Sequence, residues 1–247
     1  KKIDLIVFAS VFDISSLKLL ERLNCPAYKI ASPEITDIPL ISSVAKTKKP
    51  IIISNGLADL NDLNLAVKCI KKEKNKNLII LKCTSEYPTN SKDVNLKTMN
   101  DIKKKFKCLT GFSDHTKGMN ISIHAASKGA SVIEKHVKLN KKKSIDSFFS
   151  ITIDKFKKMI KIIRENKIAD GDVSYKITEG SKKNLNGRRS LYVVKNIAKD
   201  ELFTLRNIRS IRPSYGLHPK YLPKVLNKRA KRKINFASRL KWEDIKK

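Results

Sequence analysis

Residues 109–139 read LTGFSDHTKGMNISIHAASKGASVIEKHVKL, and this stretch decides the expected fold. Two short apolar runs, 109–112 and 131–135, flank a segment of helical periodicity at 119–128. A β-rich run, a helical segment and a second β-rich run in that order are typical of a parallel α/β architecture.

The same alternation extends over the first 170 residues. Expected strands cover residues 5–9, 27–31, 50–53, 78–83, 109–112 and 131–135, and expected helices cover 14–23, 39–46, 60–72, 95–106, 119–128 and 153–165. This series of strand–helix units predicts an α/β domain with a parallel sheet, which we assign to residues 1–170.

The remainder of the chain has a different character. Residues 171–186 are polar, and we expect them to form a linker. Residues 187–247 alternate short β-like runs with turns, so a separate and small β-rich domain is expected there.

The composition indicates which broad class of protein this is. The 247 residues are 40% hydrophobic, which is enough to build a packed core. No run approaches the about 20 apolar residues of a membrane-spanning helix, and no signal peptide opens the sequence, so we expect a cytoplasmic protein without membrane contact. The four cysteines, at positions 25, 69, 83 and 108, lack metal-site spacing and are expected to be reduced, structural thiols.

The net charge of +31 is the strongest compositional signal. Taken alone it favours nucleic-acid binding, because contacts with phosphates release counterions. However, lysines occur along the whole chain, and the one dense cluster, at 224–233, has no interleaved aromatic residues and no nucleic-acid-binding motif around it. We therefore interpret the charge as a solvated basic surface that attracts small anionic substrates, and we expect no nucleic-acid partner.

Hydroxyl groups recur where the expected strands end. The residues concerned are Ser10, Ser32, Ser54, Ser85 and Ser113, and they are joined by Lys29 in the second strand. A single serine at such a place is best explained as a helix N-cap. Five hydroxyls and an ammonium at one edge of a parallel sheet also favour a cradle for a phosphate or carboxylate, and the two roles are compatible.

Two histidines, His115 and His136, follow the fifth and sixth expected strands. A divalent ion held by two neutral imidazoles keeps open positions for water and substrate, as a Lewis-acid site requires. The alternation in SVIEKH places Glu134 on the side of His136, either as a further ligand or as a residue that orients the imidazole. An acid–base pair of His115 with Asp114, or histidines that only fill the core, are alternatives that stay open.

Several segments resemble one known family. They are YKIASPEITDIPLI (28–41), PIIISNGLA (50–58), LKCTSEYPTNSKDVNLKTM (81–99), GFSDHTKGMNISIHAASKGASVIEKH (111–136) and SLYVVKNIAKDELFT (190–204). Over essentially its whole length the chain is similar to the sialic acid synthase (NeuB) family of nonulosonic acid synthases. The segment RSIRPSYGLHPKYL (209–222) and the CTSEYP run are most similar to its pseudaminic acid synthase branch.

The resemblance implies a fold and a reaction. The fold is a TIM barrel followed by a small antifreeze-like (SAF) domain. In the reaction, phosphoenolpyruvate condenses with an amino-sugar aldehyde, for this branch a 2,4-diacetamido-2,4,6-trideoxy hexose, and phosphate leaves by C–O cleavage. The cofactor implied is a divalent metal, Mn²⁺ or Mg²⁺, which polarises the aldehyde.

The resemblance also implies roles for individual residues. His115 and His136 match the metal ligands, and Glu34 and Lys29 match residues of the reacting centre. Positions that match substrate contacts are Ser10, Ser32, Ser54, Ser85, Tyr87, Ser113, Asp146 and Arg212; Asp146 lies in a SIDS run where the family has GPD. Arg212 matches an arginine that enters the partner subunit's barrel, so a domain-swapped homodimer is implied.

The strand count departs from the family. A TIM barrel has eight strands, and six are expected here. The resemblance implies that the two missing strands are the first two of the barrel. Because such a sheet has open edges, we expect this chain to be inactive or poorly folded unless a separate piece completes it. Two alternatives remain: N-acetylneuraminate or legionaminate synthesis by the same chemistry, and nucleic-acid or carbohydrate binding without catalysis.

Overall fold

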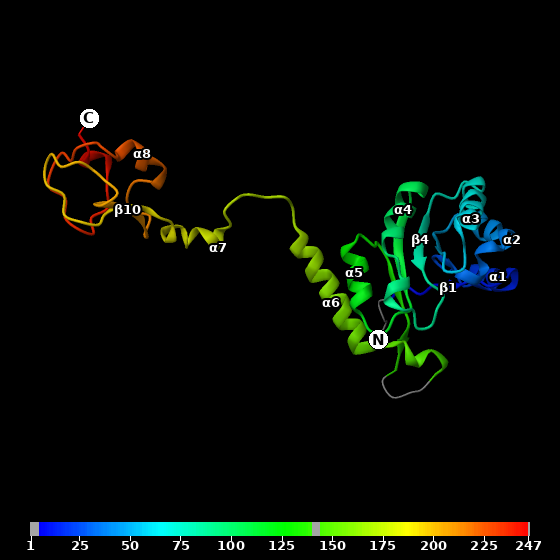
Figure 1. The fold of residues 1–247 in the computed structure, drawn as a ribbon. Helices are drawn as coiled ribbons and strands as arrows, with labels where there is room; N and C mark the ends of the chain where they lie inside the picture. The colour runs from blue at the N-terminus through cyan, green and yellow to red at the C-terminus, as the bar shows by residue number, and fades with distance from the viewer. Residues whose placement is uncertain (1–4, 140–143, 247) are drawn as a thin grey trace. The chain divides into compact units, whose positions relative to one another are not determined.

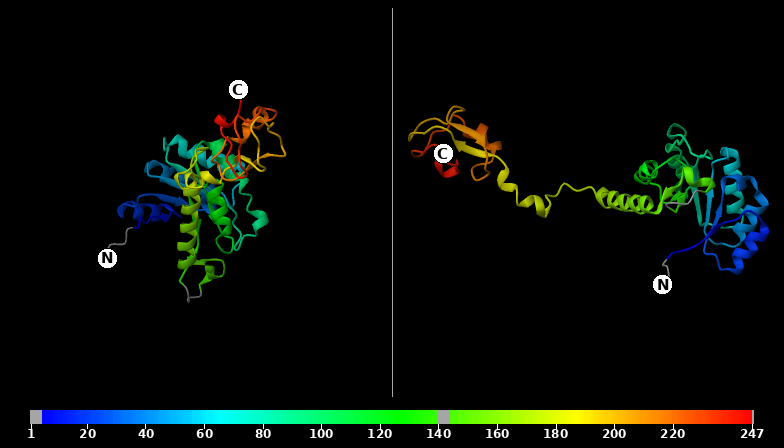
Figure 2. Two further views of the ribbon diagram at one scale, coloured as in Figure 1. Left: turned by 90° about the vertical axis from the view of Figure 1, so that its left-hand side faces the viewer. Right: turned by 90° about the horizontal axis from the view of Figure 1, so that it is seen from below.

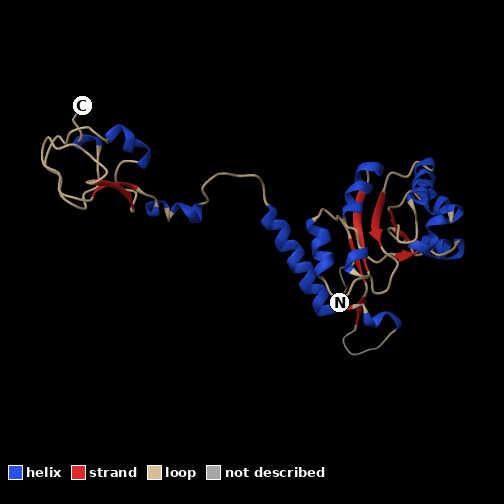
Figure 3. Ribbon diagram, viewed as in Figure 1, coloured by secondary structure: helices blue, strands red, loops and turns tan. Residues whose placement is uncertain are grey.

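A computed structural model describes residues 5–139 and 144–246 and contains two compact units, Lys1–Gly171 and Asp172–Lys247 (Figures 1 and 2). Strands and helices alternate in the first unit, whereas the second consists mostly of loops around a short strand pair (Figure 3). The expected site residues other than Arg212 all belong to the first unit.

The first unit is built on a parallel sheet of six strands. In order across the sheet they are β1 (Ala9–Ser10), β2 (Tyr28–Ile30), β3 (Ile51–Ser54), β4 (Leu78–Cys83), β5 (Leu109–Asp114) and β6 (Ile133–Lys135). Every neighbouring pair is parallel and sequential, so all the strands end at the same edge. The expected α/β fold class with a six-stranded partial barrel is confirmed.

Helices connect and cover these strands. They are α1 (Ile14–Arg22), α2 (Ile38–Lys46), α3 (Leu60–Lys72), α4 (Lys97–Phe106), α5 (Asn120–Ser127) and α6 (Ile153–Asp170). In α3, Leu63, Ala66, Val67 and Ile70 recur at helical spacing and are buried in the main core cluster. This apolar stripe holds the helix against its neighbours, chiefly α2.

The expected strand at 5–9 is largely wrong. Only Ala9 of that run is paired, through the register Ala9↔Tyr28, and Leu5, Ile6 and Val7 have exposed fractions of 74%, 83% and 78%. Within the described residues β2 is the one neighbour of β1, and it is itself three residues long. An apolar, β-branched run therefore remains unpaired because strand formation depends on a neighbour as well as on composition.

The sequence did not predict a short extension of the sheet region beyond β6. There β7 (Val137–Lys138) pairs in parallel with β8 (Ile151–Thr152). Between them lies the 3₁₀-helix η3 (Ile145–Phe148). Two further 3₁₀-helices, η1 (Ser32–Thr36) and η2 (Ser91–Asp93), follow β2 and β4. The β7–β8 pair returns the chain to the end of β6.

The second unit is small and β-rich. Its antiparallel strands β9 (Ser190–Val193) and β10 (Ile208–Ile211) are accompanied by the short helices α7 (Glu179–Lys182), η4 (Leu185–Gly187), η5 (Pro219–Tyr221), α8 (Leu222–Val225) and η6 (Trp242–Asp244). Leu191, Val193, Phe203, Ile208 and Leu240 are completely buried in its own core. The segment expected as a linker is largely exposed but contains α7 and η4.

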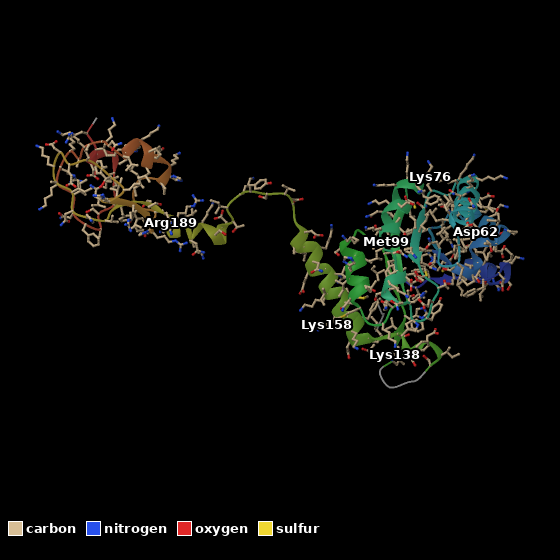
Figure 4. All side chains as sticks on the ribbon, in the orientation of Figure 1. Asp62, Lys76, Met99, Lys138, Lys158 and Arg189 are labelled. Atoms are coloured by element: carbon tan, nitrogen blue, oxygen red, sulfur yellow. The ribbon has the colours of Figure 1, made fainter. Side chains whose placement is uncertain are left out.

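Basic side chains extend from the surface of both units. Lys76 and Lys158 of the first unit and Arg189 of the second are exposed, and Figure 4 labels all three. Among the helices that the structure describes, none combines the length and the apolar character needed to cross a membrane.

Replacing Ile80 by alanine tests the core assignment. Ile80 lies in β4 and is completely buried. Its truncation should lower the free energy of unfolding by about 2–5 kcal/mol, because buried contacts are lost and a cavity is left. Ile168→Ala on α6, where the side chain is 80% exposed, is the control and should change the value by less than about 0.5 kcal/mol. The free energy of unfolding is measured by urea denaturation followed by circular dichroism. Equal decreases in both variants would contradict the assignment of Ile80 to the core.

Candidate active site

An ion pair shows that the sheet is strongly curved. Lys29 Nζ in β2 lies 3.6 Å from Glu134 Oε2 in β6, although three strands separate β2 from β6. In a flat sheet four strand spacings amount to about 19 Å, which these two side chains do not bridge. The inner faces of β2 and β6 therefore face each other across a barrel-like interior.

We use the name mouth for the end of this interior where the strands terminate. It contains most of the expected site residues: Ser10, Lys29, Ser32, Glu34, Ser54, Ser85, Tyr87, Ser113, His115 and His136. Because the strands are parallel and in sequential order, these side chains belong to one edge of the sheet.

The strand-end serines are not helix caps. Aspartates cap the first three helices: Asp13, Asp37 and Asp59 accept hydrogen bonds from the first-turn N–H groups of α1, α2 and α3. Helices α4 and α5 have no side-chain cap. The capping explanation for the five serines is therefore wrong, because their hydroxyls do not serve the starts of these helices.

Two of these hydroxyls converge over Gly56. The N–H of Gly56 donates to Ser32 Oγ at 2.9 Å, and a Cβ atom at residue 56 would lie 2.3 Å from Ser85 Oγ and 2.8 Å from Ser32 Oγ. Any side chain at this position would collide with the hydroxyls. Glycine therefore lets the loop after β3 approach them while both hydroxyls keep these positions.

Three buried polar atoms in the mouth have no hydrogen-bond partner among the described residues. They are Ser54 Oγ, Ser85 Oγ and Glu34 Oε2. A buried polar group without a partner costs about 1–3 kcal/mol, so such groups are rare unless a ligand or water satisfies them. Their concentration at the mouth indicates a site for a polar ligand.

Lys29 supplies a buried positive charge beside these hydroxyls. The residue is only 5% exposed, and in the β1–β2 register it pairs with Ser10. Burial lowers the pKa of Lys29, and the opposing effect of Glu134 only partly offsets it. Ser113 Oγ donates to Glu134 Oε1 at 2.6 Å, so Ser113, Glu134 and Lys29 form one chain across the interior.

The two histidines lie next to each other. The ring centroids of His115 and His136 are 5.3 Å apart. The Nδ1–H of His115 donates to the carbonyl oxygen of Thr84 at 2.9 Å, which leaves Nε2 as the unprotonated, coordinating nitrogen. Nδ1 of His136 lies 3.5 Å from Asp146 Oδ2, which leaves its Nε2 free as well.

These imidazoles fit a divalent cation. With a metal–nitrogen bond of about 2 Å, one ion contacts two rings at this separation. No cluster of three or more His, Cys, Asp and Glu side chains forms within the described ranges 5–139 and 144–246. Two imidazoles alone make an incomplete ligand set, which leaves positions for water and substrate oxygens.

Aromatic rings enclose the histidines. The ring of Tyr87 lies against His115 with centroids 4.2 Å apart, and the ring centroids of Phe149 and His136 are 4.8 Å apart. Phe149 is 1% exposed and reaches this place because the β7–β8 pair returns the chain to β6. Phe149 was not among the expected site residues, because neither β7 nor β8 was expected.

The two histidines have different titration behaviour. Burial lowers the pKa of His136, the neighbouring His115 lowers it further, and Asp146 only partly compensates. Burial also opposes protonation of His115, but its contacts with Cys83 and the Thr84 carbonyl outweigh this effect and raise its pKa.

Three expectations about neighbouring residues need correction. Cys83, expected as a structural thiol, lies in the mouth with Sγ 3.8 Å from His115 Nδ1. Glu134 contacts Ser113 and Lys29, and no ion pair or hydrogen bond to His136 is formed in the described residues. Asp114 pairs with Lys135 and not with His115, so the acid–base alternative is wrong. The position of Cys83, two residues before Ser85, is the feature of the sequence that indicates its place in the mouth.

Histidines without an assigned role lie elsewhere. His218 caps η5 by accepting the N–H of Lys220 at 3.1 Å. His124 lies on α5 and lines a cavity that it shares with residues of α4.

Arg212 belongs to the second unit, where it lines a basic pocket with Lys183, Arg188 and Arg189.

Comparison with known proteins agrees with this geometry. Residues 1–175 match the NeuB family and residues 188–246 match the SAF domain. The chain is 42% identical to the pseudaminic acid synthase of Campylobacter jejuni subsp. jejuni serotype O:23/36 (strain 81-176), over 98% of this chain and 71% of that protein. It is 41% identical to the pseudaminic acid synthase of Helicobacter pylori (strain ATCC 700392 / 26695), over 99% and 73%.

A solved structure supports the fold. The crystal structure of the spore coat polysaccharide biosynthesis protein spsE from Bacillus subtilis superposes with a TM-score of 0.65 at 30% identity. The match covers 98% of this chain and 74% of that chain. These findings confirm the family resemblance and the SAF domain.

His115→Gln should raise the pKa of His136, because the variant removes a ring that, when it is protonated, disfavours protonation of His136. NMR titration of the histidine ring protons in the metal-free chain measures this value. His124→Gln is the matched control and should leave it unchanged. A pKa of His136 that stays constant or falls in His115→Gln would show that the two rings do not interact.

Proposed function

This chain belongs to the NeuB family, and we propose that it catalyses the synthesis of pseudaminic acid from phosphoenolpyruvate and a 2,4-diacetamido-2,4,6-trideoxy hexose. The observation that carries the proposal is the set of buried oxygens at Glu34, Ser54 and Ser85 that have no partner among the described residues, next to Lys29 and a pair of imidazoles. The pseudaminic acid synthases among its relatives support the choice of sugar.

We assign the binding of phosphoenolpyruvate to Lys29 and the strand-end serines. Its carboxylate and phosphate are acceptors of hydrogen bonds, and the mouth offers one buried ammonium together with the hydroxyls of Ser10, Ser32, Ser54, Ser85 and Ser113. Lys29 is desolvated before substrate arrives, so an incoming anion restores part of the charge stabilisation lost on burial.

The sugar is proposed to lie against Tyr87, His136 and Asp146. The tyrosine ring covers His115, and Asp146 lies next to His136, so these residues border the space in front of the imidazoles. His115 and His136 would hold Mn²⁺ or Mg²⁺, which when bound supplies a Lewis acid for the sugar aldehyde.

The reaction forms a C–C bond and a C–O bond and breaks the C–O bond between C2 of phosphoenolpyruvate and its phosphate. C3 of phosphoenolpyruvate bonds to the aldehyde carbon, whose oxygen becomes a hydroxyl group. Water adds to C2, and phosphate leaves with its bridging oxygen. Glu34, whose Oε2 is buried and unpartnered in the described residues, is assigned the transfer of the proton that this water loses. Lys29 and the serines stabilise the charge that develops on the departing phosphate.

The proposal extends to assembly and location. Arg212 is exposed in the SAF domain, and we propose that it binds the sugar's acyl group in the mouth of a second copy, in a domain-swapped homodimer. We place the enzyme in the cytoplasm, since its four cysteines are free thiols, as a reducing compartment favours.

Phosphate release tests the reaction. It is measured on residues 1–247 and on the gene's complete reading frame, with phosphoenolpyruvate, Mn²⁺ and either the 2,4-diacetamido hexose or N-acetylmannosamine. The proposal predicts metal-dependent release with the diacetamido sugar alone and none in His136→Ala. Because the sheet of residues 1–247 has open edges, release is expected from the complete reading frame and little or none from residues 1–247 by themselves. Release with N-acetylmannosamine would assign a sister activity. Salt-sensitive retention on DNA without any release would support a nucleic-acid-binding protein instead.

Lys29→Met tests whether Lys29 and the strand-end serines bind phosphoenolpyruvate, independently of the rate of the reaction. Loss of a hydrogen bond to a charged group costs about 1.5–3 kcal/mol, so binding of phosphoenolpyruvate measured by calorimetry should weaken roughly 10- to 100-fold. Lys49→Met is the matched control, because Lys49 also pairs with a glutamate, Glu21 at 2.8 Å, on a different part of the unit. Equal affinities in the wild type and Lys29→Met would remove Lys29 from the site.

A further inference from the structure

A completely buried ion pair lies behind the two histidines. Lys135 Nζ is 3.0 Å from Asp114 Oδ2, and both side chains have no exposed surface. Asp114 and Lys135 are register partners at the ends of β5 and β6. The mechanism above uses neither residue, although each directly precedes one of the proposed metal ligands, His115 and His136.

The pair holds the backbone around His115 from both sides. Asp114 Oδ1 accepts the N–H of Thr116 at 2.8 Å, and Lys135 Nζ donates to the carbonyl oxygen of the same residue. Ser122 of α5 donates its hydroxyl to Asp114 Oδ2. Thr116, immediately after His115, is therefore fixed by a residue of β5 and a residue of β6 together.

Side chains along β5 and β6 alternate between the two faces of the sheet, and this alternation separates the Asp114–Lys135 pair from the proposed metal ligands. Ser113 and Glu134, the preceding register partners, contact each other on the inner face. Asp114 and Lys135 therefore point to the opposite face, where Ser122 of α5 lies. The pair can set the positions of the imidazoles through the backbone without touching them.

Stability alone is a weak explanation for such a pair. Removing two charges from water costs several kcal/mol, and apolar side chains of similar volume are often equally stabilising. What apolar side chains do not provide is directional hydrogen bonding to the Thr116 N–H and carbonyl groups. The geometry is consistent with a demand for positional accuracy at His115.

We propose that the Asp114–Lys135 pair is a positioning clamp that sets His115 relative to His136 and thereby tunes the affinity of the two-histidine metal site. The inference rests on the proposed function, because it takes the histidines as metal ligands. Asp114 and Lys135 are positioning residues, and Ser122 supports them from α5.

The decisive variant is Asp114→Leu/Lys135→Met in the full chain, which replaces both charges and leaves no unpaired ion. We expect a melting temperature close to that of the wild type and Mn²⁺ binding that is about tenfold weaker or worse. Calorimetry gives the affinity, and the Mn²⁺ electron paramagnetic resonance spectrum reports the change in ligand geometry. Wild-type affinity and spectrum in a folded double variant would overturn the clamp.

Ser122→Ala covers the case in which the double variant does not fold. It keeps the ion pair and removes one hydrogen bond to Asp114, so Mn²⁺ affinity should fall about two- to tenfold. Unchanged affinity in this variant would also overturn the clamp.

A matched control distinguishes positioning from general loss of stability. Arg232 and buried Asp244 form an ion pair at 2.6 Å in the SAF domain. Asp244→Asn should lower the melting temperature without altering Mn²⁺ affinity, and a comparable loss of affinity would contradict the clamp. A wild-type chain that binds no Mn²⁺ at all would refute the metal site of the proposed function itself.

Discussion

The contact between Lys29 and Glu134 across the sheet interior is the constraint on which the site depends. It joins β2 to β6 over three intervening strands, and it exists only because the sheet curves. The curvature directs the ends of the strands toward a common space. The lysine ammonium, the serine hydroxyls and the two imidazoles, which belong to the six strands and the loops that follow them, thereby become parts of one site.

Residues other than the strand-end serines satisfy the backbone groups at the helix starts, so hydroxyls in the mouth remain available to a ligand. Aspartates satisfy the starts of the first three helices, and the Thr84 carbonyl oxygen accepts a hydrogen bond from Nδ1–H of His115, while Asp146 lies 3.5 Å from Nδ1 of His136. Hydroxyls of Ser54 and Ser85 then remain without partners in the described residues, despite their burial. On the opposite face of β5 and β6, buried charges hold the backbone that carries the histidines. Structural and ligand-binding roles are thus assigned to different side chains.

Local patterns predicted the fold well wherever the chain's own periodicity decides it. The expected helix at 60–72 and the expected strand at 78–83 coincide with α3 and β4, since both carry uninterrupted apolar patterns. The strand at 5–9 failed because pairing depends on a neighbour. The histidine pair was predictable from strand-end spacing, but the role of Glu134 was not, because its partner lies four strands away in the sheet. Phe149 and Cys83 were missed for the same reason: tertiary contacts bring them to the site.

A crystal structure of the chain with Mn²⁺ and phosphoenolpyruvate bound tests the central claim most directly, with anomalous scattering to locate the manganese. The account predicts one manganese bound by Nε2 of His115 and His136, and phosphoenolpyruvate oxygens within hydrogen-bonding distance of Lys29, Ser54 and Ser85. Manganese at another place, or phosphoenolpyruvate bound away from these hydroxyls, would contradict it.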